Sequence, residues 1–122
     1  MNIADKVGSF LEERVRKNGT EGLIFYNQLA AHFDLPEVDE RWPQHPLAKI
    51  FEVLDLNDAK DGRPFRTTLV VGSVGKVPGQ GYFNMVATLR KPRPKLTTDM
   101  DRLQFFANEL QALADYYAPA KS

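Results

Sequence analysis

Hydrophobic residues recur every three or four positions in three stretches of the chain, and this spacing predicts three amphipathic helices. The first stretch covers residues 3–17 and ends at an asparagine and a glycine, which stop helices. The second starts at Pro46, because proline suits the first turn of a helix, and the Asp, Gly and Pro of residues 57–64 break it. The third is a long helix over residues 98–117 that Thr98 can cap. The apolar residues that carry these patterns are Ile3, Val7, Phe10, Leu11 and Val15, then Leu47, Ile50, Phe51 and Leu54, and finally Leu103, Phe106, Leu110, Leu113 and Tyr117.

Shorter apolar runs lie between these helices. Residues 23–26 predict a strand or the buried start of another helix. In either case a helix follows this run and ends near Pro36. Residues 65–73 are rich in β-branched side chains, which is typical of a strand. Residues 82–90 fit a helix and a strand equally well, so both alternatives stay open. The whole pattern predicts a single α+β domain over residues 1–122, with a small antiparallel sheet and a long C-terminal helix.

The composition is close to the average of globular chains. Hydrophobic residues make up 43% and charged residues 26%, and 122 residues give room for one domain with a core. The apolar runs are too short to span a membrane and the first residues lack a signal-peptide pattern, so we expect a cytoplasmic protein. Because there is no cysteine and histidine occurs twice, we expect no disulfide, no metal and no cofactor.

The net charge is zero, but the two signs are segregated along the chain. Residues 60–95 hold eight basic residues and one acid, whereas residues 34–58 hold seven acids and two basic residues. A basic stretch is typical of phosphate contacts, and the alternative is an ordinary solvated face. The candidate nucleic-acid contacts are Arg63, Arg66, Lys76, Gln80, Arg90, Lys91, Arg93 and Lys95.

A glycine-rich stretch, VGSVGKVPGQGYF at residues 71–83, lies inside the basic region. It is not a phosphate-binding P-loop, because its first two glycines lie only three residues apart and a valine follows the lysine where the metal-binding hydroxyl belongs. The sequence favours a type II turn, with Pro78 and Gly79 at its two central positions. Lys76 and Gln80 then stand near the tip of the loop, where they could meet a phosphate or a base edge.

The predicted order of helix, short strand, helix, helix, strand and glycine-rich loop is typical of a winged helix-turn-helix over residues 20–90. The stretches LIFYNQLAAHFDLP, HPLAKIFEVL and GRPFRTTLVVGSVGKVPGQGYF, within residues 23–83, resemble a family of small bacterial and phage winged-helix-like proteins. The shared pattern is a tyrosine-and-LA helix, an HPL helix, a GxP motif where the strand starts and a PGxGF loop. The chain is more distantly similar to the DNA-binding domain of alkylguanine alkyltransferases and alkyltransferase-like proteins. This similarity implies DNA binding without alkyl transfer, because the Pro-Cys-His-Arg active-site run is absent. The chain also departs from the pattern at the start of the second helix, where Phe25 stands in the place of the usual capping threonine.

Three functions follow from these observations. The first is a non-enzymatic winged-helix protein, a regulator or accessory factor, that binds double-stranded DNA through residues 60–95. The helix after Pro46 would contribute less, because its carboxylates repel phosphates. The second is a protein-interaction module, such as an inhibitor or immunity-type factor, whose acidic surface at residues 34–58 faces a basic partner. The third is a small nuclease, for which the candidate residues are His45, Arg41 and Glu37.

Two further alternatives concern assembly and metal binding. The C-terminal helix has more apolar positions than one narrow stripe needs, so either one side forms a homodimer or both sides close over the sheet. The acids Glu37, Asp39 and Glu40 are candidates for a divalent-metal site, but they lack the spacing of ligands. We therefore expect solvated loop acids there.

Overall fold

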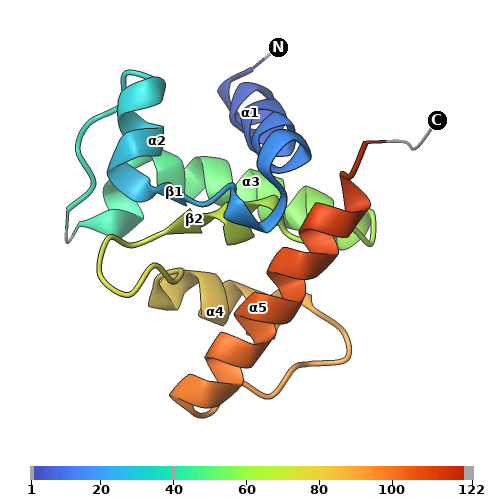
Figure 1. Ribbon diagram of the computed structural model, residues 1–122. Helices are drawn as coiled ribbons and strands as arrows, with labels where there is room; N and C mark the ends of the chain where they lie inside the picture. The colour runs from blue at the N-terminus through green and yellow to red at the C-terminus, as the bar shows by residue number, and fades with distance from the viewer. Residues whose placement is uncertain (1, 40, 120–122) are drawn as a thin grey trace.

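The structure is a computed structural model of the 122-residue chain, and it describes residues 2–39 and 41–119. In this part of the chain, five α-helices surround a two-stranded sheet, which gives an α+β fold (Figure 1). The strands β1 (Ile24–Phe25) and β2 (Val70–Val71) lie near the centre, with α1 and α2 on one side and α4 on the other. The helices are α1 (Ile3–Asn18), α2 (Tyr26–His32), α3 (Pro46–Lys60), α4 (Gln80–Leu89) and α5 (Asp99–Tyr116), and the 3-10 turns are η1 (Gly19–Glu21), η2 (Trp42–Gln44) and η3 (Arg66–Leu69).

The three helices predicted from hydrophobic spacing are confirmed. α1 follows Asn2, whose side chain caps the first turn, and it ends at Gly19, which has a left-handed φ of 58°. α3 begins at Pro46 as expected. Thr98 caps α5 and exchanges two hydrogen bonds of 3.0 Å with Asp101, so that each side chain accepts from the other residue's backbone N–H. These ends were predictable because capping depends on neighbouring residues.

The sheet is parallel, so the predicted antiparallel sheet is wrong. Ile24 pairs with Val70, and Phe25 pairs with Val71. Parallel strands need a long crossover, which α2 and α3 provide here. Within the strand predicted at residues 65–73, residues 66–69 form the turn η3 and residues 70–71 form the short strand β2. All residues from 65 to 71 are buried, which differs from the alternating pattern of a strand with one solvated face.

Of residues 82–90, for which two alternatives were open, residues 82–89 belong to a helix and Arg90 follows its end. α4 buries Tyr82, Phe83 and Val86, and it half-buries Met85 and Leu89. The glycine-rich loop therefore leads into a helix and not into a second antiparallel strand.

The loop itself also differs from the predicted turn. Gly75 and Lys76 have left-handed φ angles of 78° and 53°, whereas φ at Gly79 is −72°. A type II turn at Pro78 and Gly79 would need a positive φ at the glycine, so that prediction is wrong.

Residues from all five α-helices and both strands meet in one hydrophobic core. α5 packs against η1, η3 and α1; its side chains Phe106, Leu110 and Leu113 are buried, while Met100 and Leu103 stay exposed. A homodimer through α5 stays a prediction. Among the described helices, none has both the length and the apolar character needed to cross a bilayer.

Candidate functional site

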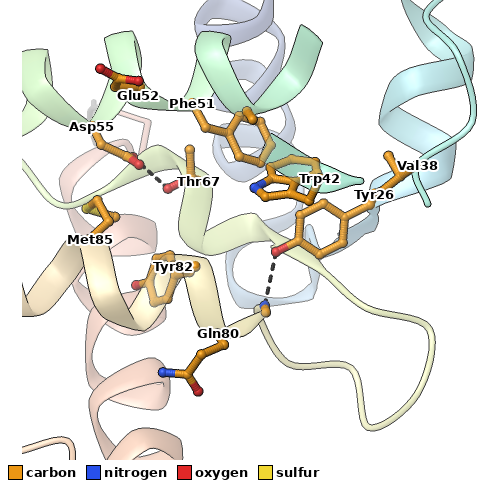
Figure 2. Close-up of a pocket in the computed structure, with 13 residues that line it drawn as sticks. Tyr26, Val38, Trp42, Phe51, Glu52, Asp55, Thr67, Gln80, Tyr82 and Met85 are labelled. Carbon is orange, nitrogen blue, oxygen red and sulfur yellow. Dashed lines mark hydrogen bonds between the residues drawn. The ribbon is translucent and has the colours of Figure 1, made fainter. Parts of the chain in front are cut away.

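A pocket of about 420 Å³ opens between α3 and the start of α4 (Figure 2). Aromatic side chains form one end of it: Tyr26 of α2, Trp42 of η2 and Phe51 of α3. The Trp42 ring centroid lies 5.4 Å from that of Tyr26, in a T-shaped arrangement, and 5.6 Å from that of Phe51, with tilted planes. The backbone N–H of Gly79 donates to the Tyr26 phenol oxygen at 3.0 Å, which fixes this ring against the glycine-rich loop.

Asp55 of α3 stands at the other end of the pocket (Figure 2). The residue is 5% exposed, and the Thr67 hydroxyl donates to its Oδ1 at 2.7 Å. Its Oδ2 has no hydrogen-bond donor among the residues that the structure describes. Burial raises the pKa of Asp55 from 3.8 to about 7; the Thr67 hydrogen bond and the charge of Arg66 oppose this shift, and the charge of Asp58 adds to it. Near neutral pH this carboxyl group therefore gains and loses its proton.

α4 closes the pocket from the side opposite α3, with Tyr82 and Met85 (Figure 2). The Tyr82 hydroxyl lies 2.7 Å from the Thr68 hydroxyl, and burial raises the pKa of Tyr82 well above 10, so this phenol stays neutral. Glu52 is exposed and belongs to the same lining. Among the lining residues the carboxyl groups are those of Glu52 and Asp55, and none of these residues is a lysine, arginine or histidine.

Two of the basic residues predicted to contact DNA hold carboxylates inside the protein. Arg66 is 7% exposed, and its guanidinium lies 3.1 Å from Asp58 and 3.7 Å from Glu12. Arg63 is half-buried and lies 3.0 Å from Asp58 and 3.4 Å from Asp61. Contrary to the prediction, Arg66 is not available to phosphate groups in this structure. Both arginines instead fasten the turn η3 and the preceding loop to α3.

Arg90 has a similar structural role. Its guanidinium donates to both carboxylate oxygens of Glu109, and the same carboxylate accepts the backbone N–H of Phe65 at 2.9 Å. The guanidinium also lies over two aromatic rings, 4.8 Å from the centroid of Phe65 and 5.6 Å from that of Phe105. Arg90 therefore links the end of α4 to α5 and to the start of η3.

Three other predicted contacts do come together. Gln80, Arg93 and Lys95 line a hollow of about 240 Å³ between α4 and residues 93–97. Within the described part of the chain, neither Arg93 nor Lys95 forms an ion pair. Lys76 and Lys91 are exposed on the neighbouring loops but do not line this hollow.

The acidic surface predicted at residues 34–58 is smaller than expected. Asp55 and Asp58 are buried, and Glu40 lies outside the described residues. The candidate metal site at Glu37, Asp39 and Glu40, where solvated acids were expected, therefore lies partly outside the described residues, among which no cluster of three potential metal ligands occurs. The acids that remain exposed in this region are Asp34, Glu37, Asp39 and Glu52.

His45, the candidate nuclease residue, caps α3. Its Nδ1 accepts the backbone N–H of Leu47 at 3.0 Å, and its Nε2 lies 2.6 Å from the carbonyl oxygen of Pro36. Arg41 pairs with Asp39 at 3.2 Å. Both nitrogens of the imidazole thus have backbone partners, which explains its buried position without a catalytic role.

The pocket residues carry no motif in the sequence, where Asp55 counts as one of seven acids on a surface. The helical spacing of α3 nevertheless indicates that Asp55 is buried. Asp55 lies four residues after Phe51 and eight after Leu47, so all three share the face of α3 that is buried. A carboxylate on the apolar face of a helix can be recognised from sequence in this way.

Comparisons of the chain with models of protein families, with curated protein sequences and with solved structures find no match.

Proposed function

We propose that the protein is a non-enzymatic DNA-binding protein that contacts the phosphate backbone of duplex DNA with the hollow between α4 and residues 93–97. The convergence of Gln80, Arg93 and Lys95 on this hollow is the observation that carries the proposal. Cations that are not paired with carboxylates can neutralise phosphates and release the condensed counterions of DNA. The amide of Gln80 can donate to a phosphate oxygen or a base edge.

The proposed winged-helix-like arrangement takes α2 and α3 as the helix-turn-helix; the loop of residues 72–79, which joins β2 to α4, would stand in the place of a wing. Lys76 stands exposed in this loop, and Lys91 is exposed after the end of α4. The contact set is then Lys76, Gln80, Lys91, Arg93 and Lys95. Contacts of this kind position a protein on DNA without selecting a sequence, so we expect weak sequence preference.

Fluorescence anisotropy of a labelled duplex across a salt series tests this proposal. We expect Arg93→Glu to weaken binding several-fold and to reduce the slope of log affinity against log salt by about one, as one phosphate contact is lost. Lys6→Glu is the matched control, because it changes the net charge equally. Lys6 is exposed on α1, which lies away from α4 (Figure 1).

Two results would contradict DNA binding through the hollow. One is the absence of binding to the wild-type protein at low salt. The other is an equal loss of affinity in Arg93→Glu and Lys6→Glu, which would mean that overall charge and not the hollow determines binding.

A protein-interaction function is the second candidate, because the exposed face of α3 carries two apolar side chains. Val53 is 43% and Leu56 is 50% exposed, and Glu52 is exposed beside them. This surface suits a partner with an apolar centre and a basic rim. A stoichiometric complex that resists nuclease, is lost in Leu56→Asp and is retained in Arg93→Glu would favour this function over DNA binding.

A further inference from the structure

We propose that the pocket between α3 and α4 binds a small organic cation whose ammonium group meets Asp55 and whose apolar or aromatic body lies against Tyr26, Trp42 and Phe51. This inference goes beyond DNA binding and does not depend on it. The two sites adjoin at Gln80, which lines both, but the other residues of α4 divide between them: Tyr82 and Met85 line the pocket, whereas Phe83 and Asn84 line the hollow.

The dimensions and walls of the pocket suit a small molecule. Its volume of about 420 Å³ lies in the usual range for such sites, roughly 300–1,000 Å³. Three aromatic rings stand at one end and a carboxyl group stands at the other (Figure 2). A ligand with an apolar body and one polar end would match this division.

Charge selects a cation for the polar end. Glu52 and Asp55 are the carboxyl groups of the lining, and no basic residue belongs to it. The π faces of Trp42 and of the neighbouring rings also attract cations. Asp55 is 5% exposed, and its Oδ2 lacks a donor among the described residues. The ionised Asp55 has one neutral hydroxyl as its side-chain donor and no cation at hydrogen-bond distance among the described residues, so its burial costs free energy; a bound ammonium group would supply the opposite charge and a second donor.

The protonation of Asp55 makes this binding depend on pH. Its pKa of about 7 reflects burial first, and the groups that face it are Thr67 and Arg66 of η3, Asp58 and Glu52 of α3, Tyr82 of α4 and Tyr26 of α2. A cation prefers the ionised carboxylate. Affinity is therefore expected to rise with pH until Asp55 is ionised and to fall again where the amine itself loses its proton, at about pH 10.

Trp42 is the single tryptophan of the chain and lines the pocket, so its fluorescence reports on occupancy. We would titrate the full chain at about pH 8, where Asp55 is ionised, with 2-phenylethylamine and with its neutral analogue 2-phenylethanol. The amine should change the Trp42 emission in a saturable way and bind at least about tenfold more tightly than the alcohol, because its hydrogen bond to Asp55 is charge-assisted.

Asp55→Asn removes the charge but keeps an oxygen that can accept from Thr67. It should weaken binding of the amine about tenfold or more and abolish the rise in affinity between about pH 6 and pH 8. Asp61→Asn is the matched control: it removes the same charge at an exposed residue that does not line the pocket, and it should leave the affinity unchanged. Circular dichroism of each variant checks that the fold is retained.

Three outcomes would overturn the organic-cation site. These are equal binding of the amine and the alcohol, equal weakening in Asp55→Asn and Asp61→Asn, and a Trp42 emission that responds to neither compound. The DNA assay with Arg93→Glu is separate from all of these measurements, so either proposal can fail alone.

Discussion

Asp55 and Asp58 lie three residues apart on the buried face of α3, and both accept hydrogen bonds from η3, yet the partners of the two carboxylates differ. Asp58 is 0% exposed and faces the core, where the guanidiniums of Arg63 and Arg66 lie 3.0 Å and 3.1 Å away. It also accepts the backbone N–H of Arg66 at 3.0 Å. Asp55 faces the pocket and has the hydroxyl of Thr67 as its side-chain donor. A carboxylate with a full set of partners holds elements together, whereas one with a vacant oxygen beside a pocket is available to a ligand.

Asp58→Asn should have the largest effect on the fold. The substitution leaves Arg66 buried with Glu12 as its remaining acid, so we expect the free energy of unfolding to fall by about 3–5 kcal/mol. Urea denaturation measures this loss. Asp61→Asn removes the exposed partner of Arg63 and should cost less than about 1 kcal/mol. Equal losses in the two variants would mean that the buried side of α3 is no more dependent on ion pairs than its surface.

Asp55→Asn should raise the free energy of unfolding relative to the wild-type protein, whereas Asp58→Asn lowers it, and the size of this gain should depend on pH. The pKa of Asp55 is about 7 in the folded chain and about 3.8 when unfolded, so the folded chain binds more protons between these values. The wild-type protein therefore loses stability as pH rises from about 4 to about 7, and the asparagine variant lacks this loss. The folded and unfolded pKa values of Asp55 differ by about three, and each pKa unit corresponds to about 1.4 kcal/mol, so the loss in free energy of unfolding is at most about 4 kcal/mol.

Urea denaturation of both proteins at about pH 5 and about pH 8 measures this difference. Asp55→Asn should gain stability relative to the wild-type protein at the higher pH. If the relative stability of the two proteins does not change between these conditions, Asp55 does not titrate in this range, and its contrast with Asp58 is smaller than the geometry indicates.

Thr67→Val should have the smallest effect of the three. Valine has nearly the same shape but lacks the hydroxyl, so the fold should lose about 1 kcal/mol with the hydrogen bond. The pKa of Asp55 should rise further, because the Thr67 hydrogen bond lowers it. Titration of the Asp55 carboxyl carbon by NMR measures its midpoint. An unchanged midpoint would show that the hydroxyl does not stabilise the ionised form.

Local signals explain which parts of the fold were predictable. The apolar spacing and caps of α1, α3 and α5 involve residues within a few positions of each other, and all three helices were predicted from them. The direction of β2 relative to β1 depends on the path of the chain through α2 and α3, which no local pattern contains. Residues 82–90 had both periodicities, and burial of Tyr82 and Val86 against the core decided for a helix.

For the charged residues, too, the sequence shows the composition of a segment but not which distant residues pair in the fold. The excess of cations over residues 60–95 is plain in the sequence, but the pairing of Arg66 with Asp58 joins residues eight positions apart across a turn. The pairing of Arg90 with Glu109 joins the C-terminal end of α4 to the middle of α5. Gln80, Arg93 and Lys95 were predicted as contacts one by one, and their convergence on one hollow comes from the packing of residues 93–97 against α4.

The Glu109 carboxylate has a consequence for how this protein can be dissected. It accepts from Arg90 at the end of α4 and from the backbone of Phe65 at the start of η3, so three segments share one acceptor. A chain truncated ahead of α5 would lose that acceptor and leave the Phe65 amide without its partner, close to the central strand β2. A loss of binding in a truncated chain would therefore reflect a disturbed interior as well as a missing surface. Single substitutions are the better way to map the binding surfaces of this protein.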